Sequence, residues 1–261
     1  MLLFLGIPTV AVCIGAFQKD SGGFTMSNIS TATSGTYLQG FENSLKLGLI
    51  EAVVPAIAGT FLAYAVHTSR GTFMRRLVVT ASGVFSQFGG IPLAFLFIAT
   101  VGAPTDLVVR WLGDVDVHGI NLYTFSGVAL VYMYFQVPLM VLVTLPAFEG
   151  LKPSWQEAAE NLGAPSWQYW RYVGIPVLMP SILGSALLLF GSSLSAYATA
   201  EALTSGTIAL TPIQIGSFLN GNVIAGQENV GKALALGLVV LIALSMSVYV
   251  LLQRRASRWL R

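Results

Sequence analysis

The segment PSWQEAAENLGAPSWQYWRYVGIPVLMP, residues 153–180, is polar and rich in Glu, Trp and Tyr, although it lies between two long apolar runs. Ser154 and Glu157 have the spacing of a capping box, in which the Ser side chain begins a helix and the Glu side chain reaches back to it. Gly163 follows the last apolar position of that helix, where a left-handed helix stop favours Gly. The segment therefore predicts a short helix, a Gly turn and a second helix over residues 167–173.

The first of these helices has one narrow apolar stripe at helical spacing. Its members are Trp155, Ala158, Ala159 and Leu162. A helix lying on the membrane surface is one interpretation, but such helices favour Lys and Arg on the polar face. Here that face holds Glu157 and Glu160, which anionic lipid would repel. The pattern therefore favours a helix that docks into a groove of another protein.

The composition is that of an integral membrane protein. Of the 261 residues, 55% are hydrophobic and 9% are charged, whereas a soluble domain carries about 25% charged residues. We expect a single domain over residues 1–261. A net charge of +2 does not indicate a nucleic-acid partner, and the single cysteine, Cys13, is expected to be a small buried residue.

Six apolar runs are each expected to form a membrane-spanning helix, because only helices satisfy the backbone of such segments in lipid. They cover residues 2–17, 44–66, 77–101, 122–148, 177–200 and 233–252. The third run is interrupted by Gly89-Gly90-Ile91-Pro92, and broken helices often mark transport sites, although a kink accommodated by packing is the alternative. The sequence therefore predicts an all-α membrane protein with six spans.

Basic residues predict the orientation, because cytoplasmic loops of membrane proteins are enriched in Lys and Arg. With six spans, nine of the thirteen basic residues lie on one side: Arg70, Arg75, Arg76, Lys152, Arg171, Arg254, Arg255, Arg258 and Arg261. We therefore expect both termini and the hairpin in the cytoplasm.

The segments on the opposite side differ in kind. Residues 18–40 are rich in Ser, Thr and Gly and are predicted to form an extended loop. Residues 101–121 include a predicted interfacial helix anchored by Trp111, and residues 201–229 include a predicted short helix near residues 213–218. GQENVGK, residues 226–232, matches most of a phosphate-binding loop, but Ala233 replaces the Ser or Thr that would hold Mg²⁺. We interpret it as a loop without nucleotide.

Polar and ionisable groups inside the spans are the candidates for a solute pathway, since such groups are costly in a membrane. Glu51 lies within the second span and Glu201 at the outer end of the fifth. The full candidate set is Glu51, Gln87, Gln136, Ser193, Tyr197 and Glu201. Hydrogen bonding between helices is an equally simple role for the uncharged members, and contact with water or a partner subunit is the alternative for the two acids. The two His residues are isolated, and the sequence indicates neither a metal site nor a catalytic constellation.

Glu157-Ala158-Ala159, followed by Gly163 and by Val173-Gly174-Ile175-Pro176, resembles the EAA motif of ABC importer permeases. The family pattern is EAA, three residues, Gly, nine residues and I-x-L-P, and this chain has VGIP in the last place. In that family the loop is a coupling helix, which sits in a cleft of the ATPase subunit. The resemblance implies that residues 153–176 form a coupling hairpin. The coupling residues implied are Glu157, Ala158, Ala159, Leu162 and Gly163.

Residues 127–132, residues 151–153 and residues 255–258 resemble the spermidine/putrescine-type subfamily. The resemblance implies the six-span type I importer fold in a bacterial cell membrane. It also implies two ATPase subunits that hold ATP and Mg²⁺, a second permease expected to be a different chain, and an extracytoplasmic solute-binding protein. The chain itself is then expected to be no enzyme and to hold no cofactor.

A polyamine is the solute that this resemblance favours, but similar permeases move ferric iron, thiamine or phosphonate compounds. The acids in the external loops fit a cation, yet the charge bias alone removes Lys and Arg from those loops. An ion-coupled transporter or channel acting alone, with Glu51 as its deep acid, is the alternative from another class. A membrane scaffold without transport is a third interpretation.

Overall fold

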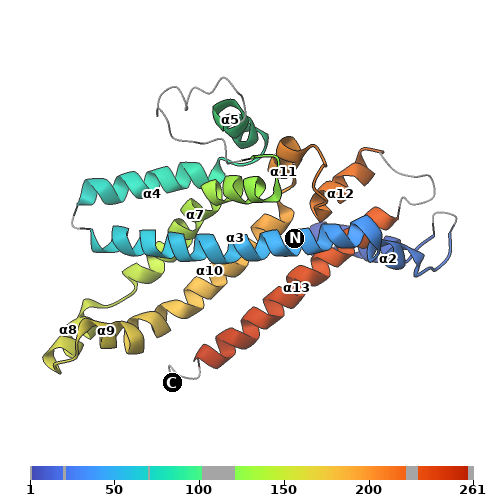
Figure 1. The fold of residues 1–261 in the computed structure, drawn as a ribbon. Coiled ribbons are helices and arrows are strands. Elements are labelled where there is room, and N and C mark those ends of the chain that lie inside the picture. Colours follow the sequence, from blue (N-terminus) through green and yellow to red (C-terminus); the bar gives the residue numbers. More distant parts are fainter. Residues whose placement is uncertain (1, 20–21, 70, 102–120, 222–228, 258–261) are drawn as a thin grey trace. The chain divides into compact units, whose positions relative to one another are not determined.

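A computed structural model describes residues 2–19, 22–69, 71–101, 121–221 and 229–257. Its helices are α1 (Leu2–Ala16), α2 (Ser27–Ala32), α3 (Gly35–Thr68), α4 (Thr72–Gln87), α5 (Ile91–Val101), α7 (Phe125–Glu149), α8 (Pro153–Asn161), α9 (Ser166–Tyr169), the π turn η2 (Trp170–Gly174), α10 (Ile175–Ser195), α11 (Tyr197–Thr204), α12 (Thr211–Leu219) and α13 (Val230–Ser257) (Figure 1). The described ranges contain one isolated β-bridge, Gln18 to Phe24, and no strand. The all-α prediction is confirmed.

Within the described residues, four helical segments are long and apolar enough to cross a membrane: Gly35–Thr68, Phe125–Glu149, Ser166–Ser195 and Val230–Leu251. The pair α4 and α5 makes a fifth if it counts as one broken span. In α1 the described apolar part, Gly6–Ala16, is shorter than a full span. The predicted number of six spans therefore stays a prediction.

The chain divides into two compact units. Unit 1 comprises Met1–Gly48, Gly90–Val128 and Leu194–Leu244, and unit 2 comprises Leu49–Gly89, Ala129–Ser193 and Ser245–Arg261. The long helices α3, α7, α10 and α13 contribute residues to both. The prediction of a single domain over residues 1–261 remains a prediction.

Unit 1 has a core in which α1, α2 and α13 meet. Its buried residues are Ala16, Ala32, Val230, Ala233 and Leu234. Asn28 donates its side-chain amide to the carbonyls of Ala16 and Gln18, at 3.2 and 2.9 Å. Asn229 donates to the same Gln18 carbonyl at 2.9 Å. The end of α1 is therefore tied to α2 and to the start of α13.

The same core corrects the prediction of an extended loop over residues 18–40. Part of that segment forms α2, and α3 begins at Gly35, nine residues before the predicted start of the second span at residue 44. The reason is that Ile29, Tyr37 and Phe41 pack against the core of unit 1. Tertiary burial outweighs the weak helix propensity of Ser, Thr and Gly.

Unit 2 brings α3, α7 and α10 together through two buried clusters. One consists of Ala63, Val141, Phe148, Leu151 and Leu178, the other of Ala56, Met140 and Leu189. A Cβ added at Gly59 would lie 2.5 Å from the Met140 Cβ, so α3 and α7 approach closely at this point. Small residues permit such close packing of helices in membranes.

The predicted interruption of the third span is confirmed. Helix α4 ends at Gln87, α5 begins at Ile91, and Gly90 between them has a φ of +77°, which favours Gly. In unit 1 the Gly90 N–H donates to the Thr199 hydroxyl at 2.8 Å, and that hydroxyl can donate back to the Gly90 carbonyl at 3.3 Å. A buried side chain of α11 thus satisfies backbone groups that the break leaves free.

The remaining predictions for the loops have mixed outcomes. The predicted helix near residues 213–218 is confirmed by α12. The predicted interfacial helix with Trp111 and residues 226–228 lie outside the described residues. Lys232, the last residue of the phosphate-loop match, lies in the first turn of α13 and donates to the Asn229 side chain at 2.7 Å.

Candidate coupling hairpin and solute pathway

The hairpin starts differently from the predicted capping box. Helix α8 begins at Pro153 with Lys152 as its N-cap, and no side chain caps it. Ser154 therefore lies inside the first turn, and the capping-box prediction is wrong. Proline at the first helical position has a preset φ and no N–H that needs a partner, so it starts the helix without a cap. Farther along α8, Gln156 donates to the Glu160 carboxylate at 3.0 Å.

The helix stop is confirmed in detail. Gly163 has a φ of +74°. Its N–H donates to the Glu160 carbonyl at 2.9 Å, and the Ala164 N–H donates to the Ala159 carbonyl at 3.0 Å. These two bonds, around a left-handed residue just after the helix, make a Schellman motif. The turn of the hairpin is therefore fixed by backbone hydrogen bonds that need Gly at this position.

The predicted apolar stripe of α8 divides into two parts. Trp155 and Ala159 are half-buried, and Trp155 packs against the cluster that contains Phe148. Ala158 is exposed, and Leu162 is 87% exposed. The half-buried part of the stripe therefore anchors α8 to the rest of unit 2. The other half, next to the exposed Glu157 and Gly163, remains available to a partner.

The second arm of the hairpin is the beginning of the fifth span. Residues Ser166–Ser195 form one continuous helical segment through the π turn η2, so the prediction of a separate second helix is wrong. The π turn precedes Pro176, whose ring would clash with the Tyr172 carbonyl and which has no N–H to offer it. A π turn bonds residues five apart and relieves this conflict.

Aromatic packing holds this arm against α3 and α7. The Trp170 ring lies edge-on to Tyr64 at 5.2 Å between ring centroids, and Tyr64 lies 6.1 Å from Phe148. A Cβ added at Gly174 would lie 2.5 Å from the Trp170 ring, so Gly174 gives the ring its room. The packing of these residues was not predicted from the sequence. The one sign of this packing in the sequence was the spacing of Trp170 and Gly174, which are four residues apart and lie just before Pro176.

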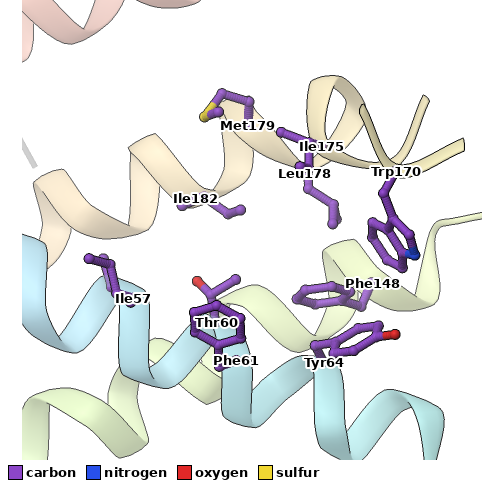
Figure 2. Close-up of a pocket in the computed structure, with 11 residues that line it drawn as sticks. Ile57, Thr60, Phe61, Tyr64, Phe148, Trp170, Ile175, Leu178, Met179 and Ile182 are labelled. Atoms are coloured by element: carbon purple, nitrogen blue, oxygen red, sulfur yellow. The ribbon is translucent and has the colours of Figure 1, made fainter. Parts of the chain in front are cut away.

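Unit 2 also contains an ion pair between α4 and α7 and a cavity lined in part by the same aromatic residues. Arg75 of α4 pairs with Glu149 of α7. A cavity of about 610 Å³ lies between α3, α7, η2 and α10. Figure 2 shows Trp170, Tyr64 and Phe148 gathered at one end of it and Ile57, Met179 and Ile182 farther along. Its lining is mostly apolar, and the side chains there that carry a polar atom are those of Thr60, Tyr64 and Trp170, none of them charged, so the cavity does not suit a charged solute.

The six predicted pathway residues are divided between the two units. In unit 2, Glu51 and Gln136 are fully buried and Ser193 is 4% exposed, whereas Gln87 is exposed at the end of α4. Gln136 donates its amide to the Leu189 carbonyl at 3.1 Å.

The two pathway residues of unit 1 lie on α11. Tyr197 and Glu201 are half-buried there. Tyr197 packs closely on Gly216 of α12. The role of all six residues in transport stays a prediction.

Comparisons with known proteins agree with this architecture. Residues 56–261 match the family described as binding-protein-dependent transport system inner membrane component. The chain is 25% identical to the spermidine/putrescine transport system permease protein PotB of Escherichia coli strain K12, covering 100% of this chain and 94% of the relative. It is 26% identical to the sulfate transport system permease protein CysT of the same strain, over 65% of this chain and 59% of the relative.

Solved structures show the same fold. A chain in the crystal structure of a bacterial alginate ABC transporter, in complex with an alginate-pentasaccharide-bound periplasmic protein, aligns with a TM-score of 0.79 at 18% identity. The alignment covers 97% of this chain and 90% of that chain. The chain therefore belongs to the family of binding-protein-dependent transport system inner membrane components, as a multi-pass permease component of an ABC importer in a bacterial inner membrane.

Proposed function

We propose that this permease imports a small polar solute, and that residues 153–176 are the hairpin through which partner ATPase subunits drive it. One observation carries the proposal. The hairpin has a rigid Gly stop, an exposed surface of Glu157, Ala158 and Leu162, and a second arm continuous with the fifth span. The exposed Ala158 and Leu162 give this surface apolar groups that a groove of a partner protein can bury.

The connection from the hairpin to the membrane supports a mechanical role. A force on α8 passes through Trp155 into the buried cluster of unit 2. A force on the second arm passes through Trp170 to Tyr64 of α3 and along α10. Closely packed interiors transmit displacement because they deform little. Closure of the ATPases is thereby expected to move α3 and α10, which opens the solute path toward the outside, and hydrolysis resets it.

A polyamine of the spermidine/putrescine kind is our first candidate for the solute, because the relative named for these compounds matches over the whole chain. The relative named for sulfate is 26% identical but matches 65% of this chain, and the neighbour named for alginate is 18% identical; both of these compounds are anions. The half-buried Glu201 is an acid, which suits a cation better than an anion. ATP and Mg²⁺ are expected in the ATPase subunits, and a second permease and an extracytoplasmic binding protein complete the complex.

The orientation follows from the hairpin. If it meets cytoplasmic ATPases, then both termini lie in the cytoplasm, as the basic residues predict. The described members of that basic set include Arg75, Arg76, Lys152 and Arg171. The side chains of Arg254 and Arg255, and Arg70, Arg258 and Arg261, lie outside the described residues.

Co-purification tests the docking role. The tagged chain is co-expressed with candidate ATPase subunits and purified in mild detergent, as wild type and as Leu162→Asp. We expect the ATPase to co-purify with the wild type and to be lost with Leu162→Asp. Leu219→Asp is the matched control, because Leu219 is 84% exposed at the end of α12. Equal loss in both variants, or in neither, would contradict docking through the hairpin.

Solute identity needs a second measurement. The complex, with its binding protein, is reconstituted in lipid, and ATP hydrolysis is measured with spermidine, putrescine, sulfate or an alginate oligosaccharide. We expect stimulation by the polyamines alone. Stimulation by sulfate or alginate alone would refute the polyamine assignment and leave the importer class intact.

A further inference from the structure

We propose that the apolar cavity of unit 2 binds one acyl chain of an anionic phospholipid, whose phosphate lies against Arg171 and His67 at one end of the cavity. The ligand is thus a lipid of the bilayer and not the imported solute. Its binding is independent of the coupling role proposed for the hairpin.

The first observation is an apolar cavity that exposed residues of two spans line in part. All of its lining residues belong to unit 2. Phe148 and Leu178 in the lining are buried, whereas Ile57 and Phe61 of α3 and Met179 of α10 are exposed. Helices α3 and α10 lie in candidate membrane spans, so this apolar surface meets hydrocarbon in a bilayer. A lipid tail can therefore enter the cavity from the membrane.

The length of the cavity fits one leaflet of the bilayer. Figure 2 shows Tyr64, Phe148 and Trp170 at one end of it, which we call the aromatic end, and Ile57 farther along α3. Seven residues separate Ile57 from Tyr64, which is about 10 Å along the helix axis. One leaflet of the hydrocarbon core is about 15 Å thick, whereas a membrane-spanning helix needs about 30 Å. A lipid tail therefore fits this cavity better than a helix of a partner subunit does.

The aromatic end lies where the spans end. Tyr64 is one turn before the last residue of α3, and Phe148 is the next-to-last residue of α7. Trp170 lies near the start of the span Ser166–Ser195. Trp and Tyr are enriched where spans meet water, because their rings are apolar while the N–H or O–H can bond polar groups. A lipid headgroup is therefore expected at this end, with its tail farther inside.

The second observation is a pair of basic side chains near the aromatic end. Arg171 precedes Ile175 of the lining by four residues, so both side chains lie near the same face of the helix. Arg171 is exposed and contacts the ring of Tyr172, and among the described residues no acid is paired with it. His67 is exposed on α3, with its ring centroid 5.9 Å from that of Phe148. Both side chains can donate hydrogen bonds to a phosphate.

The acid next to this end does not oppose an anion there. Glu149 follows Phe148, but it is ion-paired with Arg75. No charged side chain is among the described residues that line the cavity. Basic groups between membrane helices bind the headgroups of anionic lipids. Free phosphate would share the contacts with Arg171 and His67 but would leave the apolar space unexplained.

Native mass spectrometry of the full-length chain, purified in mild detergent and supplied with phosphatidylglycerol, tests the proposal. We expect the wild type to retain one phosphatidylglycerol more than Met179→Trp, because the larger side chain fills the cavity. Leu188→Trp is the matched control, since Leu188 is also exposed on α10 but does not line the cavity. That variant should retain as much lipid as the wild type. Equal retention in all three proteins, or equal loss in both variants, would overturn the proposal.

The same spectra distinguish a lipid from a second copy of the chain. We expect the lipid to be bound to the monomer. A dimer that forms without phosphatidylglycerol, and that Met179→Trp abolishes while Leu188→Trp does not, would place a second permease against the cavity and refute the lipid.

Arg171→Gln tests the headgroup contact and leaves the cavity intact, so it decides the matter if Met179→Trp fails to fold. We expect the Kd for phosphatidylglycerol to rise about fivefold, the usual contribution of one basic residue at an anionic membrane surface. Lys46→Gln is the control, because Lys46 is exposed on the same α3 as Tyr64 but about 27 Å away along the axis. An unchanged Kd in Arg171→Gln, or an equal rise in Lys46→Gln, would contradict the headgroup contact.

Competition identifies the source of the phosphate. Phosphatidylcholine has no net charge and should bind less tightly than phosphatidylglycerol, and millimolar inorganic phosphate should not displace the bound lipid. Displacement by inorganic phosphate, or equal binding of phosphatidylcholine, would refute the assignment to an anionic lipid. None of these results bears on whether the hairpin binds an ATPase.

Discussion

At the scale of single residues, two neighbouring predictions had opposite outcomes. Gly163 was predictable because a left-handed stop has few alternatives to Gly, and its φ of +74° agrees. Ser154 was predicted as the helix cap, but Pro153 begins the helix one residue earlier. Both patterns were present in the sequence. Only the backbone geometry decides which of two adjacent start signals is used.

Substitution of Gly163 tests the stop. Gly163→Ala forces an L-residue into the left-handed region, which costs about 1 to 2 kcal/mol, although the space around it is open. We expect limited proteolysis to cut the hairpin faster. Gly83→Ala is the control: it also faces open space but lies inside α4 with ordinary backbone angles, so it should not speed cleavage. Equal rates for both variants would show that the stop does not stabilise the hairpin.

Thr199 is the second residue that can be tested. Thr199→Val keeps the shape of the side chain but leaves the Gly90 N–H without its 2.8 Å bond. A fully buried donor left unpaired costs about 1 to 3 kcal/mol, and the half-buried Gly90 N–H should lie at the lower end of that range. Thr204→Val is the matched control, since Thr204 is also buried on α11 but bonds only to a carbonyl of its own helix. Thermal unfolding in detergent should show a clear loss for Thr199→Val and a small one for Thr204→Val. The reverse order would contradict the role of Thr199 at the break.

At the scale of elements, the apolar runs predicted where most long helices lie and where the third span breaks. The starts were less accurate, because α3 extends to Gly35 and the fifth span extends back to Ser166. These extensions contain polar residues and depend on packing against residues distant in sequence, such as Trp170 against Tyr64. The π turn has no compositional pattern of its own. It was therefore beyond prediction from one sequence.

The packing of the π turn η2 depends on Gly174. Gly174→Ala would place a methyl group against the Trp170 ring and displace it from Tyr64, and such overpacking costs about 1 to 3 kcal/mol. We expect a lower unfolding temperature and a shifted tryptophan emission. Gly191→Ala, on the following helix α10 and with open space around it, should change neither. Unchanged emission in Gly174→Ala would mean that the ring does not need this room.

At the scale of the whole molecule, the resemblance of one 24-residue hairpin, residues 153–176, correctly predicted the family that the comparisons show over residues 56–261. The grouping of the candidate pathway residues was not predictable. Glu51, Gln136 and Ser193 are buried in unit 2, and the bond from Gln136 to the Leu189 carbonyl depends on the register between α7 and α10, which local patterns do not encode. Tyr197 and Glu201 lie instead in unit 1. The identity of the solute was also not predictable, because relatives of similar identity are named for different compounds.

We propose that the exposed surface of α8 contacts an ATPase subunit. Site-directed photo-cross-linking in whole membranes measures this contact without purification. A photoreactive side chain is placed at Ala158, and in a control at Leu219, both exposed in the described structure. We expect a cross-linked product with the ATPase from position 158 and none from position 219. A product with the ATPase from position 219 but not from position 158, or products with lipid alone at both positions, would contradict it.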